Sequence, residues 1–258
     1  MIFDTHAHLN DERLVEEVDA IAAGMENDNL CGILTVGYDR ASSERGYKIS
    51  QKHEKIYCAV GIHPHDAKSA NRSDYDYFST VSKDKKCVAY GEIGLDFYYD
   101  LSPREVQEKV FLEQLELAHS LRMPVILHLR DAYALMNKLL VENKKKLEYG
   151  AVLHCYSGSR EMLGDFNKLD LFYSFGGAVT FKNATEKPTV IRDVPAEKLL
   201  LETDCPYMTP VPFRGKINYP KYVNLVAEKI AEILGKDINF VGDISTQNAK
   251  MLFKKIEE

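Results

Sequence analysis

The sequence predicts an α/β fold, specifically a (β/α)8 barrel with an extra helix at its C-terminal end. Three observations support this prediction. Eight short apolar runs recur along the chain, longer amphipathic stretches separate them, and the runs follow one another at intervals of about 28 residues. A chain of 258 residues has the usual length for one barrel, so we expect residues 1–258 to form a single domain.

The eight apolar runs are the expected strands. They are almost continuously apolar, as parallel strands covered on both faces are. In chain order they span residues 2–6, 31–36, 56–61, 87–92, 124–129, 150–155, 171–176 and 198–203. A doubly wound open sheet is the alternative, but it normally has fewer strands and a nucleotide-binding glycine turn after the first one. Here the first strand runs into THAHLND, which contains no glycine.

The segments between these runs have helical periodicity. The clearest is 104–121, whose apolar stripe is formed by Val106, Val110, Leu117 and Leu121 and widened by Phe111 and Ala118. We expect Ser102 to cap this helix and Pro103 to occupy its first position. The tail 219–256 predicts one or two more helices, in VNLVAEKIAEIL and TQNAKMLFKKI, that complete the outer ring.

Composition excludes several classes of protein. With 45% hydrophobic and 28% charged residues the chain is not globally disordered. It has no run of roughly 18 apolar residues and no signal-like start, so we expect a cytoplasmic protein that does not enter a membrane. Five cysteines without a C-x-x-C pair argue against a disulfide framework or a thiolate zinc site. A net charge of −6 does not attract nucleic acid, so a polyanionic substrate would need local positive charge.

Histidines and carboxylates gather at the predicted strand ends. In a (β/α)8 barrel the C-terminal ends of the strands carry the active site. Six of the eight histidines and two acids fall there: His6, His8, His63, His65, Glu92, His128, His154 and Asp204. His6 and His8 lie two residues apart on an extended strand, so their side chains share a face. The sequence therefore predicts a site at this rim.

The residue types at this rim suit two divalent metal ions. Four histidines and two carboxylates without a thiolate are more ligands than one ion requires, and such donors leave open positions for water and substrate. We expect Glu92 to bridge the ions and Asp204 to bind one ion while accepting a proton from its water. Each residue taken singly is as readily a core histidine or a capping acid, and only the coincidence across five strand ends favours a site. Whether His63 or His65 faces the site stays open.

These residues lie in segments that resemble a known family, the TatD-type deoxyribonucleases of the metal-dependent, amidohydrolase-like barrel superfamily. The matching segments are FDTHAHL, GIHPHDA, GEIGLDFYYD, PVILHLRDA, LHCYSGS, LETDCPYMTP and FRGKINYP, in that order. The resemblance implies metal ligation by His6, His8, Glu92, His128, His154 and Asp204. It also implies hydrolysis of DNA, typically at its ends, with Mg²⁺ in use and Zn²⁺, Mn²⁺ or Ni²⁺ as other divalent ions. Tyr156 and Met208 depart from the usual Phe and Leu, and neither is a ligand.

The expected function is a divalent-metal-dependent deoxyribonuclease that trims single-stranded or frayed DNA ends through a water activated by two metals. Asp204 is the expected general base, Glu92 the bridging carboxylate, and His63 a group that orients or protonates a phosphate oxygen. Arg214, Arg130 and His65 are the expected substrate contacts. The alternative is an amidohydrolase or deacylase that acts on a carbonyl, such as an aminoacyl-tRNA, a small ester or a lactone. No feature indicates an obligate protein partner.

Overall fold

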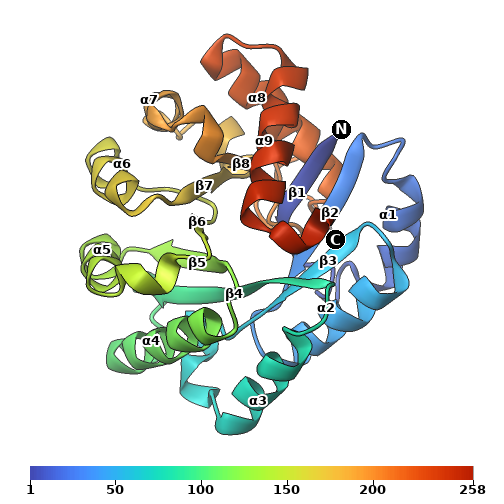
Figure 1. Ribbon diagram of the computed structural model, residues 1–258. Coiled ribbons are helices and arrows are strands. Elements are labelled where there is room, and N and C mark those ends of the chain that lie inside the picture. Colours follow the sequence, from blue (N-terminus) through green and yellow to red (C-terminus); the bar gives the residue numbers. More distant parts are fainter. Residues whose placement is uncertain (258) are drawn as a thin grey trace.

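The computed structural model describes residues 1–257 and contains eight parallel strands around a nearly closed barrel (Figure 1). Each strand pairs with the next one in the chain, so the sheet order is the sequence order. This confirms the predicted fold class. The strands are β1 Ile2–Ala7, β2 Leu30–Val36, β3 Ile56–Val60, β4 Cys87–Asp96, β5 Val125–Arg130, β6 Ala151–Leu153, β7 Phe172–Phe175 and β8 Leu199–Leu201.

The seam between β8 and β1 is closed by hydrogen bonds around and just beyond the strand ends. The Asp204 amide donates to the His6 carbonyl at 2.8 Å, and the His8 amide donates to the Cys205 carbonyl at 2.7 Å. The Thr5 hydroxyl donates to the Leu201 carbonyl at 2.9 Å. These hydrogen bonds therefore hold the segment that contains His6 and His8 against the segment that contains Asp204.

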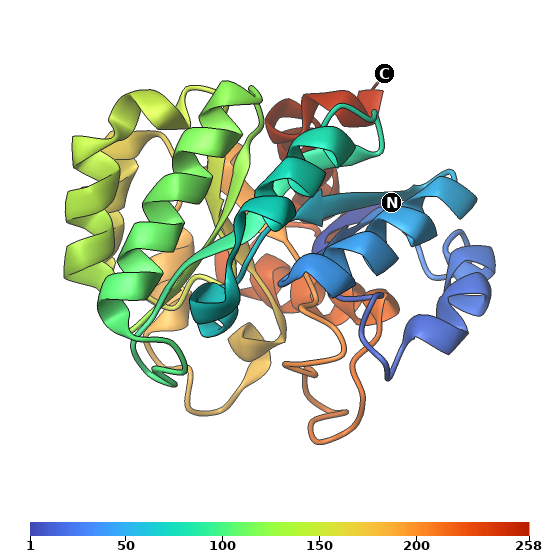
Figure 2. The same cartoon turned by 90° about the horizontal axis from the view of Figure 1, so that it is seen from below.

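Helices connect the strands and form the outer ring (Figures 1 and 2). They are α1 Val18–Gly24, α2 Arg40–Lys52, α3 Arg72–Val81, α4 Arg104–Ser120, α5 Tyr133–Glu142, α6 Arg160–Phe166, α7 Lys187–Asp193, α8 Val223–Leu234 and α9 Ile238–Leu252. Short 3-10 turns are η1 Val15–Glu17, η2 Pro64–Ser69, η3 Lys144–Leu147, η4 Asn167–Leu169, η5 Gly177–Thr180, η6 Ala196–Lys198, η7 Pro220–Tyr222 and η8 Lys254–Glu257. In Figure 2 the long orange loop between β8 and α8 projects from the lower edge, away from the C-terminus.

Three details of the helix predictions were wrong. The Ser102 side chain does not cap α4, because its hydroxyl donates to the His65 carbonyl at 2.8 Å and accepts from the Lys68 amide at 3.1 Å. Pro103 precedes the helix and Arg104 begins it. The last helix begins at Ile238, earlier than TQNAKMLFKKI suggested, because the Asp237 carboxylate accepts from the Asn239 amide and caps it.

Two buried glutamines add polar anchors to the apolar stripe of α4. Gln114 accepts from the Ile62 amide at 2.8 Å and donates to the Ile62 carbonyl at 2.9 Å. Gln107 accepts from the Asp96 amide at 2.9 Å and donates to the Asp96 carbonyl at 3.1 Å. Because each amide side chain satisfies both backbone groups of one residue, α4 fixes the chain immediately beside His63 and at the end of β4.

The barrel interior is apolar at the end opposite the strand C-termini. Its buried cluster contains Phe3, Leu34, Ala59, Val88, Ile126, Val152 and Leu200, and α9 and its C-terminal flank add Ala249, Leu252 and Phe253. Figure 1 shows α9 crossing in front of β1, and the helix packs against both β1 and β8. The apolar cluster and α9 fill this end of the barrel and leave the other end available for a site.

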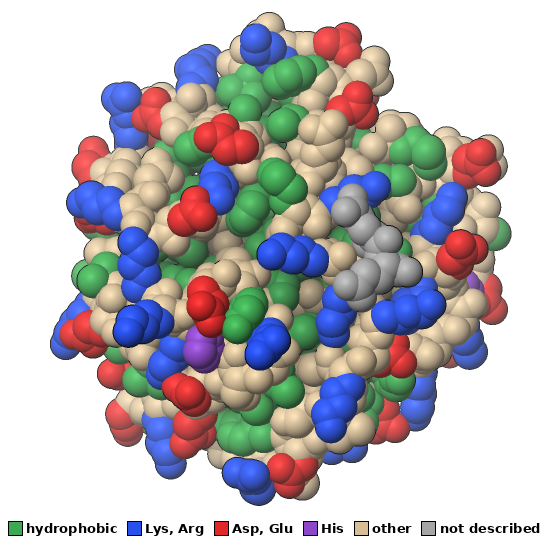
Figure 3. Space-filling view, viewed as in Figure 1, with side chains coloured by type: hydrophobic (Ala, Val, Ile, Leu, Met, Phe, Trp, Pro, Cys, Tyr) green, Lys and Arg blue, Asp and Glu red, His purple; other side chains and the backbone are tan. Residues whose placement is uncertain are grey.

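The face that carries α9 bears charged side chains of both signs. Figure 3 shows Lys, Arg, Asp and Glu side chains interspersed across it. Among the described residues, no helix combines the length and the apolar character needed to cross a bilayer.

Candidate metal centre

Strand alternation raises polar side chains above the apolar interior. On β5 the interior residue Ile126 is followed two positions later by His128, and on β6 Val152 is followed by His154. On β8 Leu200 is followed by Glu202. Because side chains two apart on an extended strand share a face, the apolar layer continues upward into a layer of imidazoles and carboxylates.

The first group of converging atoms comes from β1, from β4 and from the segment after β8. His6 Nε2 and His8 Nε2 lie 3.3 Å apart. Glu92 Oε2 is 3.4 Å from His6 Nε2 and 3.9 Å from His8 Nε2. Asp204 Oδ1 is 3.3 Å from His8 Nε2 and 3.9 Å from His6 Nε2. Two nitrogens and two oxygens therefore surround one point.

The second group surrounds the other oxygen of Glu92. Glu92 Oε1 lies 2.6 Å from His128 Nδ1, 2.7 Å from His154 Nε2 and 3.5 Å from His63 Nε2. His128 Nδ1 and His154 Nε2 are 3.2 Å apart. One carboxylate thus faces a different set of histidines through each of its oxygens.

The donor sets fit divalent cations. A neutral imidazole has one nitrogen with a free lone pair, and two such lone pairs directed at each other repel unless a cation or a proton lies between them. His6 with His8, and His128 with His154, are pairs of this kind beside a carboxylate. The ligand atoms of His6, His8 and Glu92 are close enough to hold one ion. His128 Nδ1, His154 Nε2 and Glu92 Oε1 also lie within 3.2 Å of one another. Imidazole and carboxylate donors without thiolate suit several divalent metals.

Hydrogen bonds fix two of the imidazoles with one nitrogen free for a metal. His8 Nδ1 donates to the Val36 carbonyl at 2.9 Å, so Nε2 is the free nitrogen. His128 Nε2 lies 3.1 Å from Asp96 Oδ2, so Nδ1 is the nitrogen that faces Glu92. Metal-binding histidines commonly have such a partner on the second nitrogen, which sets the tautomer and the ring orientation.

His63 is arranged as a neutral hydrogen-bond donor. Its Nδ1 accepts from the His65 amide at 3.1 Å, so the ring proton is on Nε2, the nitrogen that faces Glu92 Oε1. Burial, followed by the nearby His128, lowers the pKa of His63 well below its usual value. A neutral imidazole with Nε2–H facing inward orients an anionic oxygen and does not ligate through that nitrogen.

Carboxylate–imidazole contacts set the protonation of the cluster. Burial alone would raise the pKa of Glu92, but the surrounding histidines, His154 first, hold that pKa well below its usual range. Burial also opposes the charge on Asp204, and His8 nevertheless lowers the pKa of this carboxyl. Burial disfavours a charged His154, yet Glu92 raises its pKa well above 6.5. The carboxylates are therefore ionised, and protons compete with metal for the imidazoles.

The centre forms the floor of a pocket of about 480 Å³. Its other lining residues include His65, Arg130, Tyr99, Tyr207 and Met208. Arg130 supplies a positive charge, and the two tyrosines supply aromatic surface. His65 Nε2 lies 2.9 Å from Asp96 Oδ2. The Arg130 guanidinium lies over the rings of Tyr98 and Tyr99, at 3.9 and 4.8 Å from their centroids.

Arg214 does not line this pocket. It is exposed in the loop after β8, and its guanidinium stacks 4.0 Å from the Phe181 ring centroid. The structure therefore brings together His6, His8, His63, His65, Glu92, His128, Arg130, His154 and Asp204, and leaves Arg214 outside the group.

Two buried acids of the site were missed in the sequence. Asp96 orients His65 and His128, and Glu202 lies 3.7 Å from His154 Nδ1 through its Oε1. A signal was available for both. Asp96 lies four residues after Glu92 on one strand, and Glu202 lies two residues before Asp204, so period-two alternation places each acid on the same face as a predicted ligand.

Comparison with known proteins agrees with this geometry. A family described as TatD related DNase matches residues 3–254. The chain is 40% identical over 254 residues to YabD of Bacillus subtilis (strain 168), an uncharacterized metal-dependent hydrolase, covering 98% of this chain and 99% of the relative. It is 33% identical over 261 residues to the 3'-5' ssDNA/RNA exonuclease TatD of Enterobacter lignolyticus (strain SCF1), covering 98% of each.

A solved structure resembles the whole chain. The crystal structure of YjjV, a TatD homolog from Escherichia coli K12, superposes with a TM-score of 0.92 at 27% identity and covers 98% of both chains. The fold, the rim of histidines and carboxylates and these full-length matches lead to one conclusion. The chain belongs to the family of TatD related DNases and is a metal-dependent hydrolase.

Proposed function

We propose that the centre holds two divalent ions and that the protein hydrolyses phosphodiester bonds of DNA from single-stranded or frayed ends. The observation that carries the proposal is the division of Glu92: Oε2 faces His6 and His8, and Oε1 faces His128 and His154. Asp204 completes the first half. Mg²⁺ is the proposed working ion, for which the carboxylates and water are suitable ligands, and Zn²⁺, Mn²⁺ or Ni²⁺ are the alternatives, of which Zn²⁺ and Ni²⁺ suit the imidazoles.

The ions supply charge and the protein supplies proton transfer and orientation. Divalent ions held by His6, His8, Glu92, His128, His154 and Asp204 would polarise a phosphate and make water more acidic. Asp204 Oδ accepts the proton of the attacking water. His63 Nε2–H donates to a non-bridging phosphate oxygen. Glu92 keeps the two halves in one geometry, and Asp96 and Val36 hold His128 and His8 in the required tautomers.

The charge of the pocket explains why a polyanion would depend on the ions. Glu92, Asp96, Asp204 and Asp66 line the pocket, and among the described lining residues Arg130 is the one Lys or Arg. Without cations this surface repels phosphate. With cations it attracts phosphate locally, although the net charge of the whole chain is −6.

The shape and lining of the pocket favour a single strand. A DNA duplex is a rigid rod about 20 Å wide, with major and minor grooves of about 12 and 6 Å. A rod of this width does not enter a concave barrel mouth. Tyr99 and Tyr207 are 53% and 44% exposed, and such rings stack on bases without reading sequence. Arg130 and His65 contact phosphate beside the centre, and Arg214 contacts the strand farther out. The name of the Enterobacter lignolyticus relative, a single-stranded DNA and RNA exonuclease, supports this substrate class.

A carbonyl substrate is the second candidate. From the loop after Asp204, Tyr207 and Met208 line the pocket, whereas Arg214 and Lys216 are exposed and do not line it. This lining suits an ester, an amide or an aminoacyl-tRNA in an amidohydrolase or deacylase reaction.

One experiment separates the two candidates. The purified protein is stripped with chelator, reloaded with Mg²⁺, Mn²⁺ or Zn²⁺, and incubated with end-labelled single-stranded DNA, duplex DNA, RNA and generic ester or lactone substrates. We expect metal-dependent shortening of single-stranded DNA. Hydrolysis of esters or lactones without cleavage of any nucleic acid would contradict the nuclease proposal and support the carbonyl alternative.

A further inference from the structure

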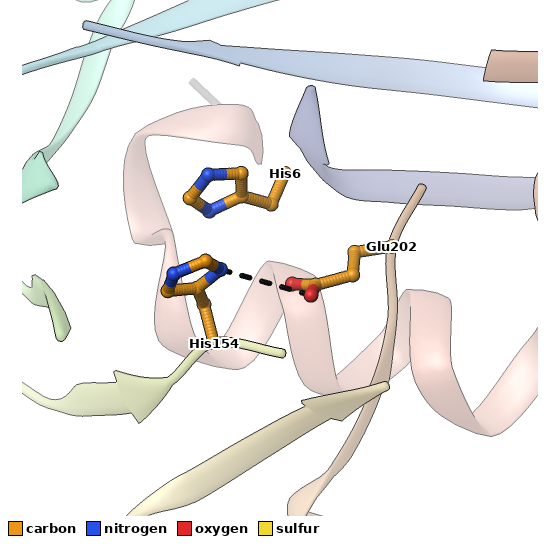
Figure 4. A group of neighbouring side chains, drawn as sticks. All are labelled: His6, His154 and Glu202. Carbon is orange, nitrogen blue, oxygen red and sulfur yellow. Dashed lines mark ion pairs between the residues drawn. The ribbon is translucent and has the colours of Figure 1, made fainter. Parts of the chain in front are cut away.

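Two imidazoles of the metal centre, those of His6 and His154, lie near a second buried carboxylate, Glu202. His6 and His154 are stacked, with ring centroids 4.1 Å apart and an interplanar angle of 14°. His6 Nε2 faces Glu92 Oε2 at 3.4 Å and His154 Nε2 faces Glu92 Oε1 at 2.7 Å, so the two rings belong to different halves of the centre. Glu202 lies beside this pair, with one ligand atom from each of the three residues within 4.8 Å of the others (Figure 4).

Three polar atoms of this cluster lack hydrogen-bond partners among the described residues. His6 Nδ1, His154 Nδ1 and Glu202 Oε1 are buried and make no hydrogen bond within residues 1–257. His154 Nδ1 is directed at Glu202 Oε1 from 3.7 Å, as Figure 4 shows. By contrast, the second nitrogens of His8 and His128 are bonded to Val36 and Asp96. Buried polar groups without partners are costly, so three of them in one place indicate a role.

The carboxylate of Glu202 is held in place from the other side. The residue is 0% exposed, and its Oε2 accepts a hydrogen bond from the Ser174 hydroxyl on β7. Gly176, also next to β7, makes room for it, since a Cβ there would lie 3.3 Å from Glu202 Cγ. Because Ser174 uses one oxygen, the other is available to the imidazoles.

We propose that Glu202 is the shared positioning residue of the metal centre, keeping the ring protons of both His6 and His154 on Nδ1. Each Nε2 then presents its lone pair to a different half of the centre. A carboxylate on the second nitrogen of a metal-binding imidazole fixes its tautomer and increases its basicity. Glu202 thus links the two halves through the Nδ1 atoms of His6 and His154, and Glu92 links them on the side of the Nε2 atoms. This inference rests on the proposed two-ion centre.

The test compares Glu202→Gln with a matched control, Asp96→Asn. Both replace a buried carboxylate by its amide, but Asp96 contacts only one of the ligand histidines, His128. Calorimetric titration of the metal-free protein with Mn²⁺ or Zn²⁺ measures both binding steps. We expect Glu202→Gln to weaken both steps by about 10- to 100-fold and Asp96→Asn to weaken one. In both variants, the melting temperature of the metal-free protein and the KM for the substrate should differ little from those of the wild type.

A second measurement does not depend on a variant. Nitrogen-15 NMR of histidine-labelled, metal-loaded protein reports which ring nitrogen carries the proton, and we expect Nδ1–H for His6 and His154. If Glu202→Gln does not fold, Ser174→Ala replaces it as the test variant. Ser174→Ala removes the hydrogen bond to Glu202 but leaves the carboxylate in place, so metal binding should weaken by only a few-fold.

The outcomes are distinguishable. If the wild type binds two ions and Glu202→Gln binds both as tightly, or if the proton is on Nε2, Glu202 is no positioning residue although the centre stands. If the wild type binds a third ion that Glu202→Gln loses, Glu202 is itself a ligand and the inference is wrong. If the wild type binds one ion only, both the two-ion centre and the shared role fail. Nuclease assays then test the proposed reaction separately.

Discussion

Replacement of Asp204 by asparagine separates its two proposed roles, metal ligand and general base. The amide keeps the size of the side chain and removes its charge. Asp204 Oδ1 lies 3.3 Å from His8 Nε2 and 3.9 Å from His6 Nε2, and within residues 1–257 its ion-pair contacts are confined to these two histidines. The substitution should therefore weaken one of the two metal-binding positions and leave the half around His128 and His154 unchanged.

The size of the expected decrease in kcat depends on which of the two lost roles, metal binding or proton transfer, excess metal can restore. Excess metal restores occupancy of a weakened position, whereas it cannot restore a missing proton acceptor. Positioned acid–base groups contribute about 10²–10⁴-fold, so kcat at metal saturation should stay at least about 10²-fold below that of the wild type. This corresponds to about 2.7 kcal/mol of lost transition-state stabilisation.

The assay is single-turnover cleavage of an end-labelled single-stranded oligonucleotide across a Mn²⁺ titration, with KM and melting temperature measured alongside. Asp66→Asn is the control, because Asp66 lines the same pocket and is separate from the converging ligand atoms. It should cause only a small change. Full recovery of Asp204→Asn activity at high metal would refute the reasoning, because Asp204 would then be a ligand only.

Three further predictions concern the same centre. Glu92→Gln should lower metal content and activity together while the fold survives, because one half loses an oxygen ligand and both halves lose the negative charge; unchanged metal content by elemental analysis would contradict the bridging arrangement. Arg130→Ala should raise the KM for single-stranded DNA more than Arg214→Ala does, and each should reduce the salt slope of binding by about one unit, since one phosphate contact is lost; identical salt slopes in wild type and variants would argue against both contacts. The stabilisation by metal should grow with pH. Protonation of histidines such as His154, whose pKa is raised, stabilises the metal-free fold below about pH 6.5 and is lost as the pH rises through the folded pKa. The metal-induced rise in melting temperature, measured from pH 6 to 8, should therefore increase, and a constant or falling difference would contradict this.

Local patterns determined the fold and the core of the site. Apolar runs mark strands wherever both faces are covered, so all eight strands overlap their predicted ranges. Alternation with period two placed His6 and His8 on one face, and their Nε2 atoms are 3.3 Å apart. The position of a residue at a strand end is likewise a local property, and the barrel brings all such ends to one rim.

Tertiary contacts decided what the pattern left open. The Ser102 side chain bonds to the carbonyl of His65, 37 residues away in the chain, instead of capping its own helix. Arg214 follows Asp204 closely in sequence, yet it stacks on Phe181 and not on the pocket.

The orientation of each imidazole depends on groups from other strands. His8 bonds to Val36 on β2, His128 to Asp96 on β4, and His154 faces Glu202 beyond β8. A sequence lists such residues without showing which nitrogen each one contacts. The sequence therefore determined which residues gather at the rim, because spacing along a strand is local. Only the folded barrel decided which atom of each faces the centre, because that depends on pairing between strands distant in the chain.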